Sequence, residues 1–101
     1  MYITKTELEE LAKYFAGRLD HALIHEENGV VVQVDLYKVD VDETKVTIII
    51  EIPDNVVDID KIEILNVDQK VAITRSVNIT KNSNRGLMVE FHHTIMEVDT
   101  E

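Results

Sequence analysis

Apolar side chains recur at helical spacing over the first part of the chain. From Leu8 onward they return every three or four residues, which predicts an amphipathic helix with one buried stripe. The stripe consists of Leu8, Leu11, Ala12, Phe15, Leu19, Ala22 and Leu23. Asn28 and Gly29 predict the end of this helix, because glycine accepts the left-handed conformation found there. Gly17 is a weak point inside it, since glycine has a poor helix propensity.

The start of the helix carries a capping signal. Thr4 and Glu7 have the spacing of a capping box, in which the threonine side chain accepts a hydrogen bond from the backbone three residues later. Ile3 and Leu8 have the spacing of the hydrophobic staple that accompanies such a cap. We therefore expect the helix to begin directly after Thr4.

After Gly29 the apolar and polar positions alternate, which is the period of β-strands. The predicted strands span residues 30–41, 46–52, a short stretch around 62–64, 70–79 and 87–96. The apolar parity changes near Tyr37 and Lys38, which predicts a β-bulge in the first strand. Because the connections are short, successive strands should pair antiparallel, as in a meander.

These elements predict a single α+β domain over residues 1–101. The N-terminal helix should pack on one face of a mostly antiparallel sheet of about five strands. The 101 residues are 45% apolar, which is enough for one core. No apolar run approaches the length of a membrane span, and the first residues do not have the pattern of a signal peptide.

Composition narrows the classes of function. Twenty acidic residues against ten basic ones give a net charge of −10, which repels nucleic acid and anionic membranes but permits basic protein partners. The chain has no cysteine, so it has no disulfide framework and no thiolate site, and it suits the cytoplasm. Compact size, acidity and the lack of cysteine also suit a bacterial or phage protein.

Motifs of catalysis and cofactor binding are missing from the sequence. The glycines are scattered, so no phosphate-binding loop is predicted, and neither Ser76 nor Ser83 has the surroundings of a serine nucleophile. His21 and His25 lie one turn apart on the predicted helix, a spacing that can chelate zinc. The metalloprotease motif requires glutamate after the first histidine, where this chain has Ala22. We therefore predict solvent-facing histidines, with no catalytic, cofactor-binding or metal site.

The final strand, LMVEFHHTI, raises the question of which histidine faces the core. By parity His93 shares the apolar row of Phe91, and His92 lies on the opposite face. Closing a hairpin between the last two strands would place Arg75 opposite or next to His93. Three interpretations stay open for this pair: ordinary packing of the two side chains, a partner-binding patch, or a catalytic or ligand site.

The second face of the sheet is expected to be half apolar, because one helix covers only one face. Such a face, or an open sheet edge, is typical of a surface that meets a partner. The alternative interpretation is an ordinary solvated antiparallel face with a few scattered apolar residues. The candidate partner-contact residues are Tyr37, Ile49, Leu65, Arg75, Met88, His92, His93 and Met96. The leading prediction is a small acidic non-enzymatic binding or assembly protein that acts through its sheet, with another protein or a second copy as partner.

Two alternatives belong to other classes. An acidic inhibitor that mimics DNA would present carboxylates to a nucleic-acid-processing protein, without binding nucleic acid itself. Its candidate residues are Glu7, Glu9, Glu10, Asp35, Asp40, Asp42 and Glu43. A metal or hydrolytic site would use His93 with Arg75, or His21 with His25.

Overall fold

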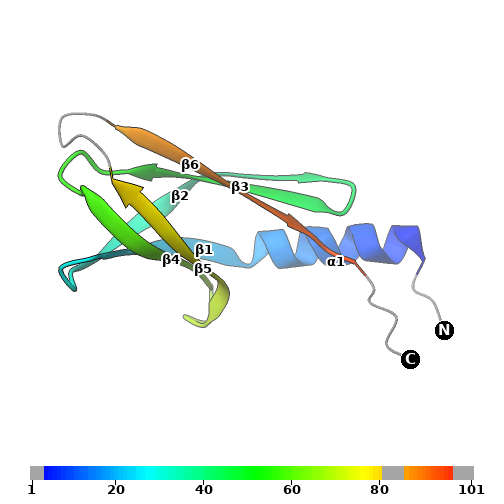
Figure 1. The fold of residues 1–101 in the computed structure, drawn as a ribbon. Coiled ribbons are helices and arrows are strands. Elements are labelled where there is room, and N and C mark those ends of the chain that lie inside the picture. The colour runs from blue at the N-terminus through cyan, green and yellow to red at the C-terminus, as the bar shows by residue number, and fades with distance from the viewer. Residues whose placement is uncertain (1–3, 81–85, 97–101) are drawn as a thin grey trace, which may run out of the picture.

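One helix and six strands make up the residues that the structure, a computed structural model, describes: 4–80 and 86–96 (Figure 1). The elements are α1 (Lys5–Gly17), β1 (Leu19–Glu26), β2 (Val31–Asp42), β3 (Lys45–Ile52), β4 (Asp58–Asn66), β5 (Val71–Thr80) and β6 (Leu87–Thr94). The predicted α+β class is confirmed, with six strands in place of five. The additional strand is β1, which replaces the second half of the predicted helix.

The predicted helix start is confirmed. Thr4 is the N-cap of α1, and its Oγ1 accepts a hydrogen bond from the backbone N–H of Glu7 at 3.2 Å. This bond satisfies one of the backbone donors that every helix leaves unpaired in its first turn. The predicted staple involves Ile3, which lies outside the described residues.

The predicted helix end was wrong. The helix ends at Gly17, Arg18 caps it, and the chain enters β1 at Leu19. Ala22 and Ile24 are fully buried at two-residue spacing, and Ile24 is not a member of the predicted helical stripe. The backbone of β1 pairs with β2 on one side and β4 on the other. Pairing on both sides outweighs the weak local preference of this segment for a helix.

The strands form one antiparallel sheet in the order β5-β4-β1-β2-β3-β6. Hairpins join β1 to β2, β2 to β3 and β4 to β5, so the order is meander-like. The predicted bulge is confirmed by a shift in the β2–β3 register between Leu36 and Lys38. The register opposes Leu36 to Ile50 and Lys38 to Ile49, which leaves Tyr37 as the extra residue.

The predicted hairpin between the last two strands was wrong. β5 and β6 occupy opposite edges of the sheet, and β6 pairs with β3, where His93 lies opposite Val46. β3 carries a fully buried apolar row, and pairing with it places Phe91 beside Ile48 in the core. Burial of this apolar surface favours β3 as the partner of β6.

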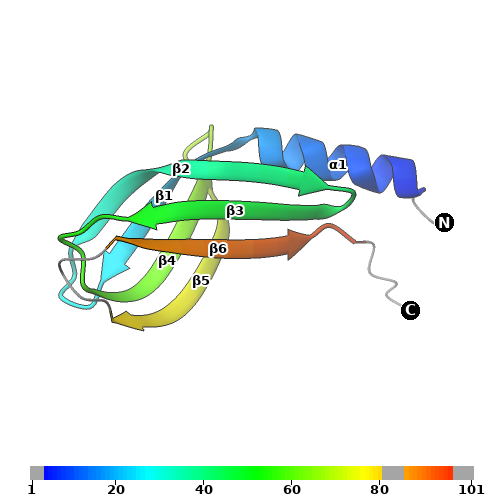
Figure 2. The ribbon, with the colours of Figure 1, turned by 90° about the horizontal axis from the view of Figure 1, so that it is seen from above.

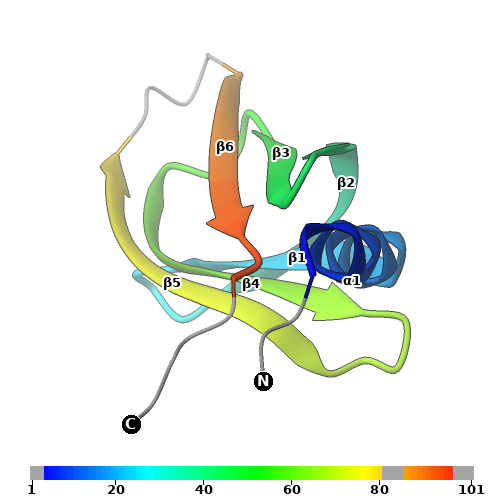
Figure 3. The same cartoon turned by 90° about the vertical axis from the view of Figure 1, so that its right-hand side faces the viewer.

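The sheet curls so that its two ends face each other around a common interior (Figure 3). α1 packs against the inner side of β2 and β3, which run on beside it as a long hairpin (Figures 1 and 2). The core lies between these layers and contains Ala12, Ala22, Ile24, Val46, Ile48, Ile50, Ile52, Val56, Ile59, Ile62, Ile64 and Phe91. The inner face is thus covered by the helix and by the curl of the sheet, whereas the outer face has no described element over it.

Candidate interaction surface

Four of the predicted contact residues lie close together on the outer face of β2, β3 and β6. We call Tyr37, Ile49, Met88 and His92 the outer patch. Ile49 is opposite Glu90, and Met88 and His92 are the outward residues on either side of Glu90 along β6. Ile49 also opposes Lys38, next to Tyr37, on the other side. The outer patch therefore crosses three adjacent strands and reaches the edge of the sheet (Figure 2).

The β-bulge explains the exposure of Tyr37. A regular strand would turn either residue 37 or residue 38 inward, but the extra residue lets both Tyr37 and Lys38 stay exposed. Tyr37 is 63% exposed and Met88 is 47% exposed, and it is their grouping with Ile49 on adjacent strands, more than the exposure of either, that is informative. The flanking positions Asp35, Glu51 and Glu90 give the outer patch a mainly acidic rim, and Lys38, opposite Ile49, is a basic residue beside it.

His92 is held at the edge of the outer patch by two polar neighbours. Its Nδ1 shares a hydrogen bond of 3.2 Å with Thr47 Oγ1, and its Nε2 lies 3.6 Å from Glu90 Oε2. Thr47 is directly opposite His92 in the β3–β6 register. These contacts orient the imidazole ring along the sheet surface.

The other predicted contact residues lie elsewhere. Leu65 on β4 is only 7% exposed and is therefore largely inaccessible to a partner. Met96 is exposed just beyond the end of β6. Arg75 places its guanidinium carbon 4.9 Å from the centre of the Phe91 ring. The His93 ring lies 5.5 Å from the ring of Phe15 on α1.

The predicted pairing of Arg75 with His93 is replaced by two separate contacts with aromatic rings. Both residues belong to the inner rows, as their parity predicts, yet both remain exposed at the margin of the core. Contact of these polar groups with aromatic rings corresponds to the first of the three interpretations, packing of the side chains.

The β1 histidines do not lie on a helix surface as predicted. His21 is 3% exposed, and its Nδ1 lies 2.8 Å from Asp20 Oδ2. His25 Nε2 lies 2.5 Å from Glu63 Oε1. Each histidine has its own carboxylate partner, and no cluster of three or more histidine, aspartate or glutamate side chains able to hold a metal ion occurs in the described part of the chain.

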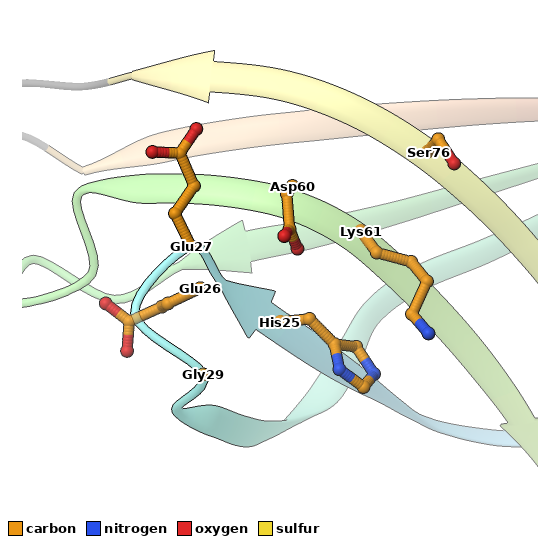
Figure 4. A pocket seen from close by; sticks show the side chains of 7 residues that line it. All are labelled: His25, Glu26, Glu27, Gly29, Asp60, Lys61 and Ser76. Carbon is orange, nitrogen blue, oxygen red and sulfur yellow. The ribbon is translucent and has the colours of Figure 1, made fainter.

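A polar hollow of about 380 Å³ adjoins His25 on β1, β4 and β5. Figure 4 shows the residues that line it, which are His25, Glu26, Glu27, Gly29, Asp60, Lys61 and Ser76. The side chains of Glu26 and Glu27 point away from His25, and the charged groups do not converge on one point (Figure 4). Convergent polar groups are what a catalytic site requires, so this hollow gives no support to one.

Sequence reasoning missed an apolar cleft of about 310 Å³ beside α1. Its lining comes from α1, the start of β1, the β4–β5 hairpin and the segment after β6: Leu11, Tyr14, Phe15, Arg18, Leu19, Asn66, Ala72 and Ile95. The cleft forms where α1 ends at Gly17 and the chain turns into β1. The predicted helix, which continued to Asn28, has no such turn and so gave no indication of a cleft here. No signal in the sequence marks these residues as neighbours.

Comparisons with protein-family models, curated proteins and solved structures give no match to this chain. Within the described residues, no helix is long and apolar enough to cross a membrane.

Proposed function

We propose that the protein is a small acidic binding or assembly protein without enzymatic activity, and that it acts through the outer patch and the adjoining edge of the sheet. The observation that carries this proposal is the exposure of Tyr37 and Met88 on a face that no described element covers. Large exposed apolar side chains grouped on one surface are typical of protein interfaces, where tyrosine and methionine are enriched.

The charge of the surface favours particular partners. The acidic rim of the outer patch and the net charge of −10 favour a partner with basic residues around an apolar centre. A second copy of the chain is compatible where the contact places acidic side chains opposite basic, histidine or uncharged groups, because like charges across an interface are destabilising.

Two tyrosines provide a matched test of the outer patch. Tyr37 is 63% exposed on β2 and Tyr14 is 64% exposed on α1, so the same substitution at each removes an equally exposed ring. We expect Tyr37→Ser to weaken binding of a different protein as partner by tenfold or more, as loss of a buried tyrosine often does at interfaces. Tyr14→Ser should leave binding unchanged. Loss of binding in Tyr14→Ser but not in Tyr37→Ser would contradict the outer patch and indicate that the cleft beside α1 is the binding surface.

The DNA-mimic alternative has less support. Its carboxylates would have to form uninterrupted rows, but Glu43 lies 3.5 Å from Lys5 and Asp40 lies 3.2 Å from Lys38. Interspersed lysines lower the negative potential that such a mimic needs. Salt-sensitive capture of a purified basic nuclease, lost in an Asp40→Asn and Asp42→Asn double variant, would restore this alternative.

The histidine-based alternative has less support for a geometric reason. Arg75 and His93 contact different rings, and His21 and His25 contact different carboxylates. No step of acid–base chemistry is therefore proposed for them.

A further inference from the structure

Among the residues that the structure describes, no strand pairs with the outer side of β5 or of β6, and these two edges of the curled sheet differ in how well they are protected. Proteins blunt open edges with lysine, proline, bulges or inward-pointing charges, because an edge offers unpaired peptide groups to another chain. β5 has such devices: Arg75 stands on its inner row, and its register with β4 shifts twice. β6 pairs with β3 from Leu87 to Thr94 without a shift, and although it carries Glu90 and, on its inner row, His93, it contains no lysine, arginine or proline.

The direction of the free peptide groups on β6 follows from one hydrogen bond. The backbone N–H of Ile95 donates to the carbonyl of Thr44, at the β3 side, at 2.9 Å. In an antiparallel pair the residues bonded to the neighbour alternate with residues that point away from it. The residues whose backbone N–H and C=O groups point away from β3 are therefore Met88, Glu90, His92 and Thr94, and we call them the edge-facing residues. Figure 2 shows β6 at the margin of the sheet, with β3 on its other side.

These four residues fit a second copy of β6 in one antiparallel register. Backbone hydrogen bonds between the two copies can form only where an edge-facing residue lies opposite an edge-facing residue of the other copy. A shift of the register by one residue would break these pairs and place inner-face side chains opposite outer-face ones. A twofold axis through Phe91 places Glu90 opposite His92 of the other copy, and Met88 opposite Thr94. All four edge-facing residues then form backbone hydrogen bonds with the other copy, and the Glu90 carboxylate of each copy faces the His92 imidazole of the other.

The neighbouring registers are less favourable. A twofold axis through Glu90 would place the two Glu90 carboxylates opposite each other, and like charges directly opposite are destabilising. An axis through His92 would oppose the two imidazoles and leave Met88 outside the paired part of β6. The register through Phe91 is thus selected by charge and by the number of backbone bonds.

We propose that two copies of this chain join their sheets through β6, antiparallel and centred on Phe91, into one continuous sheet. The inference rests on the proposed function: it names a second copy as partner and places the contact at the edge of the sheet that adjoins the outer patch, so that Tyr37, two strands away on β2, lies outside this contact. On the inner side, Phe91 meets Phe91 and Val89 meets His93 of the other copy. On the outer side the two outer patches become continuous across the new contact, which buries part of Met88.

Disulfide cross-linking tests both the partner and the register, and the chain has no cysteine of its own to interfere. Residues directly opposite in a bonded pair have Cα atoms about 5.5 Å apart, within the range of a disulfide. We expect the double variant Met88→Cys with Thr94→Cys to form a covalent dimer on oxidation. An equimolar mixture of the two single variants should do the same.

Each single variant is the control for the other. In the proposed register the two copies of position 88, like the two copies of position 94, lie six residues apart along the strands, about 20 Å, so neither single variant should cross-link alone. The proposed register would be overturned if one single variant formed a covalent dimer by itself. It would also be overturned if neither the double variant nor the mixture formed a covalent dimer. Circular dichroism of each single variant verifies the fold before mixing.

Light scattering separates failure of this inference from failure of the proposed function. A dimer without the cross-link between positions 88 and 94 would contradict the β6 contact and leave the outer patch as the site of self-association. A monomer at all accessible concentrations would contradict the second copy as partner. The comparison of Tyr37→Ser with Tyr14→Ser would then decide the proposed function with a different protein.

Discussion

His92 and His93 are neighbours in the chain but have unrelated surroundings. His92 lies on the outer face with Thr47 and Glu90, whereas His93 stacks near Phe15 at the mouth of the core. The two-residue period of a strand separates them. The same period puts Arg75 and Phe91 on the inner rows of β5 and β6, where the guanidinium of Arg75 lies over the Phe91 ring. Polar groups in contact with aromatic rings therefore line the margin of the core.

The Arg75 contact is weak but measurable. Arg75→Met retains most of the apolar stem and removes the charge over the Phe91 ring. We expect the free energy of unfolding to fall by about 0.5–1 kcal/mol, which is typical of cation–π pairs at exposed sites. Urea denaturation measures this change. If Arg75→Met lowers the free energy of unfolding by the same amount in a Phe91→Leu background, the contact with the Phe91 ring is not the cause of the loss.

At the scale of elements, the transition from α1 to β1 takes place within two residues. Gly17 ends the helix, Arg18 caps it, and β1 begins at Leu19. Gly29 performs a different task in the turn before β2, where its φ of 92° is unfavourable for other residues. The two glycines should therefore respond in opposite ways to the same substitution.

Gly17→Ala should raise the free energy of unfolding by less than about 1 kcal/mol, because alanine favours the helix. An added Cβ at this position has open space around it. Gly29→Ala should lower the same quantity by about 1–2 kcal/mol, because alanine is strained at positive φ. Thermal and urea denaturation of both variants would verify the pair. Destabilisation by Gly17→Ala would show that this position needs glycine for the turn into β1.

The sequence is informative wherever one periodicity dominates. Val46, Ile48 and Ile50 alternate without ambiguity, and their strand is where the pattern predicts it. The segment from His21 to His25 fits both the helical and the alternating period, and only its pairing with β2 and β4 decides between them. Local patterns carry no information about such distant partners.

Strand partners were the other part that the sequence could not predict. The face of each histidine on β6 follows from parity, but the choice of β3 over β5 depends on which apolar row is left to cover. The outer patch was predictable as a set of outward residues. Its continuity was not, since it requires the order β2-β3-β6.

At the scale of the whole molecule, charge opposes compactness. A net charge of −10 on 101 residues produces self-repulsion in the folded state, and the charge pairs among the described residues lie mostly at the surface. Exposed ion pairs contribute little to stability. The core of isoleucine and valine must therefore supply most of the stabilisation.

Salt should for this reason stabilise the protein. Raising the ionic strength from about 0.01 to about 0.15 M shortens the Debye length from about 30 to about 8 Å, which screens the repulsion between distant carboxylates. We expect the midpoint of thermal unfolding to rise over this range, with sodium chloride as the salt. A fall would indicate that attractive pairs outweigh the repulsion.

The pairing of β6 with β3 also has a consequence for folding. Thr47 and His92 are 45 positions apart in the chain, and β1, β2, β4 and β5 can all pair without either of them. Closing such a long loop is entropically slow compared with forming the hairpins. In any partly folded chain in which β6 is not yet paired, the edge of β3 beside its isoleucine row is open, and such an edge is where aggregation begins.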